Sequence, residues 1–289
     1  MSFLEFLHFE AGFEAFPIMV LWAFDKEQMP EPEAPLKYRD REPGFRPSRQ
    51  EDPLNAILRR CSLKGAPSGK LAGKRFGLKN NICVSGMPMT CGSLMLEDYV
   101  ADTDATIVTR LLDAGAEVTA LLNLENFSFS GGGETSAFGP ILNPHNPEHL
   151  ASGSSGGSAA ALYYDDIDIT IGADQGGSIR MPASWCGVVG LKPTFSLVPY
   201  TGIVGVDNTI DHVGPMARTV EDAALTLEVI AGKDPLDPRQ GDVPVQQYTE
   251  ALGQGVRGLR IGLLTEGFGT ALSEDDVDES VRKAINLFG

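Results

Sequence analysis

The chain has 289 residues, of which 42% are hydrophobic, and its 23 basic and 39 acidic residues give a net charge of −16 at pH 7. A chain of this length can bury a sizeable core, as one large domain or two smaller ones. The acidic balance argues against a nucleic-acid-binding surface and against an anchor for anionic membranes. We therefore expect a globular protein with neither a nucleic-acid partner nor a membrane partner.

The N-terminal segment is apolar but does not have the pattern of an export signal. The uncharged run at residues 15–24 is about half the length needed to cross a bilayer, and no Lys or Arg precedes it. An amphipathic helix packed on the domain, or on a second copy in a homodimer, fits this pattern better. Residues 25–53 carry six prolines and many charges, which predicts an extended arm. The sequence thus predicts a helix and arm over residues 1–52 and a core over 53–289.

Helices and strands are expected to alternate along the core. Apolar spacing and turn residues predict helices over 54–60, 104–115, 158–164, 178–183, 219–231 and 273–288, and strands over 75–78, 117–122, 167–171 and 259–264. Thr219 and Ser273 are the expected N-caps of the last two helices. Helix-then-strand order is typical of a layered α/β domain.

Two glycine-flanked serine turns dominate the middle of the chain. The first is Gly153-Ser154-Ser155-Gly156-Gly157 and the second is Gly176-Gly177-Ser178. Glycine lets a substrate carbonyl approach backbone N–H groups closely. Ser178 is therefore a candidate nucleophile, and the amides of Gln175, Gly176 and Gly177 are a candidate oxyanion hole. Either turn alone would more simply be structural, but the pair at this spacing favours chemistry.

A nucleophilic serine needs a base, and the histidines do not supply an obvious one. His145 and His149 lie in a proline-rich loop where exposure to solvent is expected, and His212 follows a charged loop. The four cysteines show neither a CxxC pair nor a spacing with histidine that predicts a metal site. Reduced, mostly buried thiols fit a cytoplasmic location.

The stretch from Ser152 to Thr194 resembles the glycine- and serine-rich signature of the amidase signature family, and looser similarity runs from about Pro35 to Gln240. The resemblance implies an α/β fold with a mixed β-sheet sandwiched between layers of α-helices. Family members are usually much longer, with a C-terminal half that completes the sheet. The resemblance therefore also implies that this chain is truncated at its C-terminus.

The family's Ser–cis-Ser–Lys triad has matching residues in this sequence. Ser178 matches the nucleophile, Ser154 matches the bridging serine after a cis peptide bond, and Lys79 matches the lysine base. A free lysine is cationic at neutral pH, but burial of its ammonium lowers the pKa, so a buried Lys79 could accept a proton through Ser154. The resemblance implies no metal and no cofactor.

Other positions of the signature match supporting roles. Ser130, Gly131 and Gly132 resemble the family loop beside the acyl pocket, and Asp174 and Arg180 could hold the oxyanion amides in place. Asn80 stands where an aspartate commonly follows the lysine, which removes one charge near Lys79.

The main functional hypothesis is an amidase that hydrolyses a small carboxylic amide to the acid and ammonia or an amine through an acyl-enzyme on Ser178. The residues of these motifs resemble most those of free-standing amidases of small-amide or nitrile-degradation type. An alternative is the A subunit of a glutamine-dependent tRNA amidotransferase, although the long arm before Lys79 argues against it. A second alternative is a catalytically impaired fragment, which only the truncation supports.

Overall fold

The computed structural model describes residues 36–242 and 244–288. They belong to two compact units, the first ending at Glu250 and the second starting at Ala251. The expected N-terminal helix, and the homodimer through it, lie outside the described residues.

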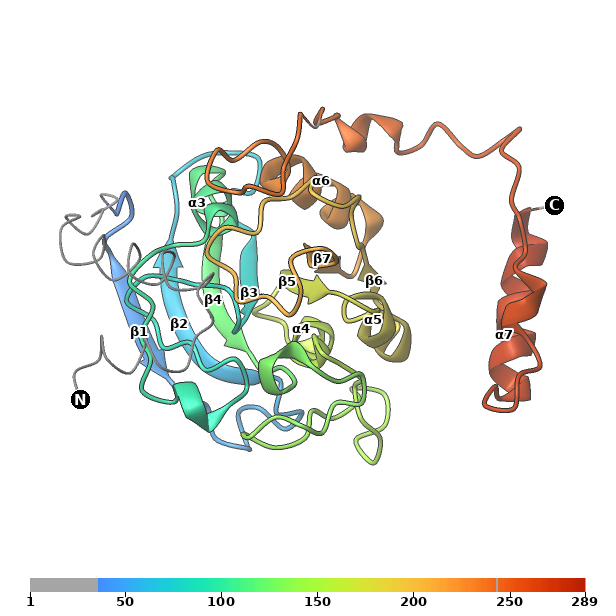
Figure 1. Cartoon of the computed structure of the whole chain (residues 1–289), viewed down its shortest axis with the longest axis horizontal. Coiled ribbons are helices and arrows are strands. Elements are labelled where there is room, and N and C mark those ends of the chain that lie inside the picture. The colour runs from blue at the N-terminus through green and yellow to red at the C-terminus, as the bar shows by residue number, and fades with distance from the viewer. Residues whose placement is uncertain (1–35, 243, 289) are drawn as a thin grey trace, which may run out of the picture. The chain divides into compact units, whose positions relative to one another are not determined.

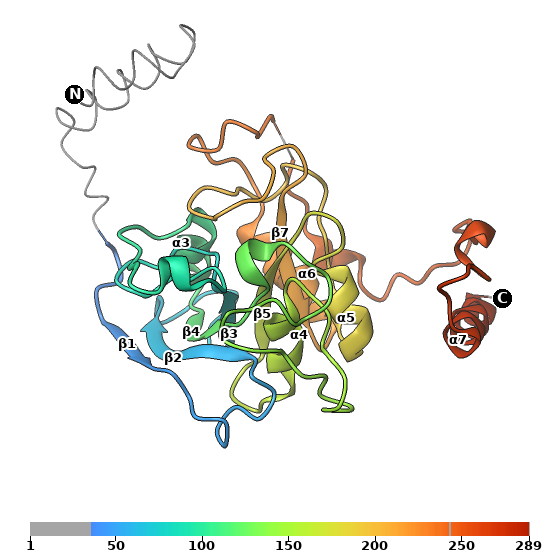
Figure 2. The ribbon, with the colours of Figure 1, turned by 60° about the horizontal axis from the view of Figure 1, so that its bottom comes forward.

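The first unit is built on a mixed seven-stranded sheet with the strand order β1-β2-β4-β3-β5-β7-β6. Only β3 runs parallel to its two neighbours, β4 and β5, and the remaining strand pairs are antiparallel. Figure 2 shows β1 and β2 at one edge of this sheet, away from β7. The strands are β1 (Arg41–Phe45), β2 (Ile57–Lys64), β3 (Arg75–Lys79), β4 (Glu117–Leu122), β5 (Ile169–Asp174), β6 (Val189–Gly190) and β7 (His212–Ala217).

Helices cover both faces of the sheet. On one side lie α3 (Thr106–Asp113) and α6 (Val220–Ile230), and on the other lie α4 (Gly156–Ala160) and α5 (Arg180–Cys186) (Figure 1). Because side chains alternate along a strand, Phe76 and Leu78 of β3 enter the core beneath α3 and α6, whereas Lys79 points to the other face. The two buried faces confirm the expected three-layer α/β architecture.

Two corrections concern the start of the chain's described part. Residues 41–45 are not a free arm but the edge strand β1, paired with β2; an edge position tolerates Pro43, which has no N–H. The expected helix at 54–60 is also wrong, because β2 begins at Ile57. Asn55 has a left-handed backbone (φ 55°), which excludes a helix there, and Asp52 accepts the N–H groups of Ala56 and Ile57.

Most other elements of the first unit are where the sequence places them. The strand at 117–122 is β4, and α6 is capped by Thr219, whose Oγ1 accepts the Asp222 N–H at 3.1 Å. The helix expected to begin at Ser178 instead begins at Arg180, so Ser178 lies in the turn that precedes α5. The helix expected at 158–164 is α4, which continues as a 3₁₀ turn to Tyr163.

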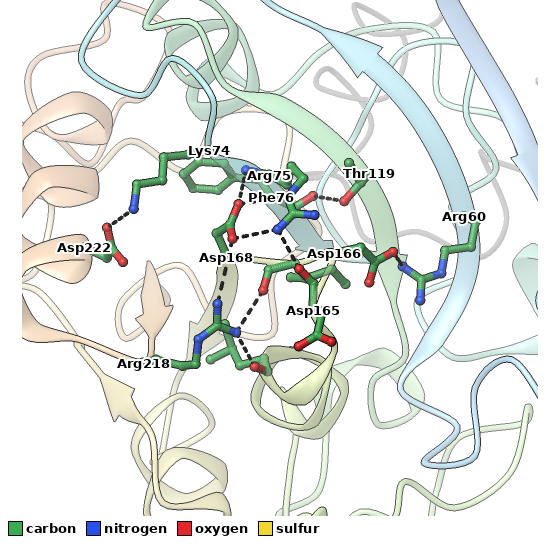
Figure 3. A network of polar contacts seen from close by, with 12 residues as sticks. Arg60, Lys74, Arg75, Phe76, Thr119, Asp165, Asp166, Asp168, Arg218 and Asp222 are labelled. Carbon is green, nitrogen blue, oxygen red and sulfur yellow. Dashed lines mark hydrogen bonds and ion pairs between the residues drawn. The ribbon is translucent and has the colours of Figure 1, made fainter.

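An ion-pair network fixes the amino ends of β3 and β5 (Figure 3). The Arg75 guanidinium binds both oxygens of Asp168, at 3.0 and 2.9 Å, and also donates to the carbonyl of Asp165 at 2.6 Å. Arg218 donates to the carbonyl of Ile167 at 3.0 Å, and Lys74 pairs with Asp222 of α6 at 2.7 Å. The network therefore fixes the start of the strand that carries Lys79 at its other end.

The second unit contains one α-helix in its described part, α7 (Asp275–Ile285). The N-cap residue is Glu274 rather than Ser273, and Val277 and Val281 on this helix are exposed. The strand expected at 259–264 is also wrong: these residues are irregular, and no neighbouring strand pairs with them in the described part of the unit. Among the helices that the structure describes, none has the length and apolar character needed to span a membrane.

Candidate active site

The candidate residues gather where β3, β4 and β5 end. These three strands are parallel, so their carboxyl ends lie at the same edge of the sheet. Lys79 is the last residue of β3 and Asp174 the last residue of β5, while the segment after β4 leads into the loop at 130–133. Ligand sites of α/β sheets commonly form at this edge.

Lys79 and Ser154 are directly hydrogen-bonded. The Lys79 Nζ lies 2.7 Å from the Ser154 Oγ, and both residues have no exposed surface. The peptide bond between Gly153 and Ser154 is cis, as the family resemblance implies. An added Cβ on Gly157 would lie 2.2 Å from the Asn123 carbonyl oxygen, so only glycine permits this approach of α4 to the end of β4.

Burial dominates the electrostatics of Lys79. Desolvation lowers the pKa of its ammonium to about 7, and the nearby groups that raise it only partly offset this effect: Asp174, Cys91, Glu125 and Asp211. A large share of Lys79 is therefore neutral at physiological pH. A neutral amine can accept a proton from the Ser154 hydroxyl, which a cationic ammonium cannot.

Ser178 lies in the second serine turn and is 6% exposed. Its carbonyl accepts the Ser155 N–H at 3.1 Å, which ties the two serine turns together. Ser155 Oγ bonds the backbone of Ala173 in β5 at 3.0 and 3.1 Å, so the first turn is also fixed to the sheet. No hydrogen bond joins the hydroxyls of Ser154 and Ser178 in the part of the chain that the structure describes. Such contacts often tighten only when a substrate is bound.

Asp174 organises the backbone around Ser178. Its carboxylate accepts the N–H groups of Gly177 and Ile179 at 2.9 and 3.1 Å, and it pairs with the Arg180 guanidinium at 2.9 and 3.0 Å. Burial alone would raise the pKa of Asp174, but Arg180 and the backbone amides hold it below its ordinary value. The Gly177 N–H is thus already engaged, whereas the N–H groups of Gln175 and Gly176 have no hydrogen-bond partner within the described residues.

The loop at 130–133 lies against the cis-peptide turn. The Gly131 carbonyl accepts the Gly153 N–H at 2.9 Å and the Ser152 hydroxyl at 2.8 Å. A Cβ added to Gly131 would meet the Met181 Cε at 3.0 Å, and one added to Gly177 would meet the Met181 Cγ at 2.9 Å. Met181, which sequence reasoning missed, therefore lies between this loop and the nucleophile turn.

A second residue that sequence reasoning missed is Glu125, which is completely buried. Its carboxylate accepts the N–H groups of Gly133 and Thr135 and the Thr135 hydroxyl. The signal available in the sequence was its place just after the strand at 117–122, at the functional edge of a parallel sheet.

The histidines stay outside this cluster. His145 and His149 are exposed, as expected, and His212 bonds the Ile210 carbonyl and Lys192. His8 lies outside the described residues. Within the described ranges, no group of three or more His, Cys, Asp or Glu side chains is arranged to hold a metal ion.

A family model described as Amidase matches residues 53–288 of the chain. The chain belongs to the amidase signature family. The family's model begins just before β2, and it includes both serine turns and the lysine strand.

Individual relatives carry two kinds of name. The chain is 47% identical over 216 residues to the A subunit of a glutamyl-tRNA(Gln) amidotransferase from Synechococcus, covering 75% of this chain and 44% of the relative. It is 44% identical over 243 residues to an enantioselective amidase from Rhodococcus rhodochrous, covering 83% and 46%. A solved bacterial aryl acylamidase is similar with a TM-score of 0.72 and 30% identity, covering 83% of this chain and 53% of that structure. The chain thus spans about half the length of the amidase-family relatives that it matches.

Proposed function

We propose that the site hydrolyses a carboxylic amide through an acyl-enzyme on Ser178, with Ser154 and Lys79 as the proton relay. The observation that carries the proposal is the buried Lys79, whose Nζ lies 2.7 Å from the Ser154 Oγ. Its lowered pKa, about 7, makes a neutral base available without help from histidine.

The relay accounts for each proton of the reaction. Ser178 Oγ attacks the amide carbon while its proton passes to Ser154, and the Ser154 proton passes to Lys79. When the tetrahedral intermediate collapses, the carbon–nitrogen bond breaks and Ser154 protonates the leaving nitrogen, taking its own proton back from Lys79. Water then attacks the acyl-enzyme along the same route and releases the acid and Ser178.

Stabilisation of the oxyanion is assigned to the Gln175 and Gly176 amides, which are free to donate. Asp174 fixes this turn through the Gly177 N–H and the Arg180 ion pair. Removal of one such donor costs roughly 10²–10³-fold in turnover in well-studied acyl-transfer enzymes. We assign contact with the acyl group to the loop of Ser130, Gly131 and Gly132, which lies against the Ser154 turn.

The curated relatives favour glutamine as the amide and a protein complex as the setting. Several of them are named as the A subunit of glutamyl-tRNA(Gln) amidotransferase, at 42–47% identity. In that role the ammonia released from glutamine would pass to a partner subunit. The 44% identity to the enantioselective amidase supports a second candidate, a free-standing amidase that hydrolyses small amides alone.

Two measurements test these proposals. A tagged fluorophosphonate should label the wild-type chain at Ser178, as located by mass spectrometry of the labelled peptide. If the wild-type chain is not labelled at Ser178, the nucleophile assignment is wrong. Ammonia release from benzamide or propionamide by the purified chain alone would support the free-standing candidate. Release from glutamine that requires partner subunits would support the amidotransferase candidate.

A further inference from the structure

Glu125 lies between the two backbone segments that carry the proposed relay and the proposed substrate loop. It lies shortly after the end of β4, and its side chain has no exposed surface. A carboxylate at such a site needs donors for its oxygens, because an unpaired buried charge is very costly. The donors that it finds belong to the glycine loop at 130–133 and to the residues that follow it.

The first set of contacts is with that loop. The Gly133 N–H, the Thr135 N–H (2.7 Å) and the Thr135 hydroxyl all donate to the Glu125 carboxylate. Three donors to one carboxylate fix the C-terminal end of the 130–133 loop. Two of these donors are backbone groups, so their positions follow from the chain's path and not from side-chain rotamers.

The second set of contacts is with the turn that carries Ser154. The Glu125 N–H donates to the Ser154 carbonyl at 3.2 Å. A Cβ added to Gly153 would lie 2.6 Å from the Glu125 Cγ and 2.7 Å from its Oε1, so the side chain packs directly on the Gly153 backbone. Glu125 therefore contacts the loop on one side and the cis-peptide turn on the other.

We propose that Glu125 is a positioning residue that fixes the substrate loop against the Ser154 turn and supplies negative charge to the Lys79 environment. The inference rests on the proposed function, since it concerns the same relay. Nothing in the family resemblance assigned a role to this position.

The charge of Glu125 gives the proposal a readout that a merely structural residue would not affect. The titratable groups that act on the pKa of Lys79 are Asp174, Cys91, Glu125 and Asp211, and each of them raises it. Burial raises the pKa of the Cys91 thiol itself to about 12, so this thiol is uncharged at the pH of the experiment. Without the Glu125 charge the pKa of Lys79 falls further. The pH at which the relay becomes active must then fall too.

The experiment measures the rate of Ser178 labelling by a fluorophosphonate from pH 5 to 9 in the full chain. In Glu125→Gln one oxygen acceptor is replaced by an amide N–H₂ that faces backbone donors. We expect the labelling rate at its optimum to fall roughly tenfold or more, as for a buried donor left without an acceptor. The acid limb of the profile should shift to lower pH.

Two further variants separate the effect of the Glu125 charge from the effect of its side-chain length. Glu125→Asp keeps the charge but is one methylene shorter, so the rate should fall while the acid limb stays at its wild-type pH. Glu148→Gln is the matched control: it makes the same chemical change on an exposed residue outside the site, whose charge is not among those that act on Lys79. Its profile should equal that of the wild type. Circular dichroism establishes that each variant is folded.

The outcomes discriminate between the inference and the proposed function. A wild-type acid limb in Glu125→Gln overturns the inference, even if the rate falls, because the charge then plays no part. If Glu125→Gln does not fold, a wild-type labelling rate in Glu125→Asp overturns it instead. Failure of the wild-type chain itself to label at Ser178 overturns the proposed function, and the inference with it.

Discussion

The burial of Lys79 should make the free energy of unfolding depend measurably on pH. Its pKa of about 7 in the fold compares with 10.5 in an unfolded chain, so between these values the unfolded state binds more protons than the folded state. Stability therefore rises with pH across this window, and it falls as the pH drops toward 7. Over the whole window the effect amounts to about 5 kcal/mol, at roughly 1.4 kcal/mol per pH unit.

Lys79→Met isolates the contribution of Lys79 to the pH dependence of stability, because methionine fills similar space without a titrating group. The free energy of unfolding, measured by urea titration at pH 7 and pH 9, should rise in the wild type by about 2 kcal/mol more than in Lys79→Met. The figure is smaller than two full pH units would give, because half of Lys79 is already neutral at pH 7. The variant also leaves the Ser154 hydroxyl without its partner, but that cost is the same at both pH values.

Two results are decisive for this reasoning. If the wild type and Lys79→Met gain stability in parallel between pH 7 and 9, Lys79 remains protonated in the fold and cannot act as a base. If the extra gain is present but Ser178 labelling shows no acid limb near pH 7, Lys79 titrates without taking part in the relay.

Three more changes test neighbouring parts of the site. Ser178→Ala should abolish fluorophosphonate labelling and leave the circular dichroism spectrum unchanged; normal labelling would place the nucleophile elsewhere. Lys79→Arg should lower the labelling rate roughly 10²–10⁴-fold, because a guanidinium cannot release its proton, and near-normal labelling would show that Lys79 acts only as a fixed positive charge. Asp174→Asn should cost about 1–3 kcal/mol in urea unfolding, because it removes the Arg180 ion pair and one acceptor of the turn's amides; wild-type stability would contradict that role.

The sequence predicted the local elements of the first unit where the pattern is regular. The strand at 117–122 and the helix capped by Thr219 needed only their own residues, because the alternation and the cap are local signals. The prediction of a helix at 54–60 is wrong, because a left-handed Asn55 and the pairing of β2 with two neighbouring strands override the helical pattern. The prediction of a strand at 259–264 is wrong for a different reason. An apolar run forms a strand only where another strand can pair with it.

The site was predictable to a different extent. The family resemblance predicted roles for Ser178, Ser154 and Lys79, and Asp174 and Arg180 were predicted from their places beside the nucleophile turn. Glu125 was missed because its place after the strand at 117–122 was its only local signal: its contacts with Gly133, Thr135 and the Ser154 turn form only in the folded chain. Asp211 lies far from Lys79 in the sequence but acts on the lysine's pKa, because β7 begins beside the end of β5.

The carboxylates around Lys79 bear on the basicity that the proposed relay requires of a buried amine. Burial alone would lower the pKa of Lys79 further, and an amine with a very low pKa is neutral but too weak to draw a proton from a serine. Asp174, Glu125 and Asp211 act in the opposite direction and help to hold the pKa near 7. A base with its pKa near the working pH combines a substantial neutral fraction with enough proton affinity. The same carboxylates bind the backbone of the surrounding turns, so the geometry of the site and the basicity of its lysine depend on shared residues.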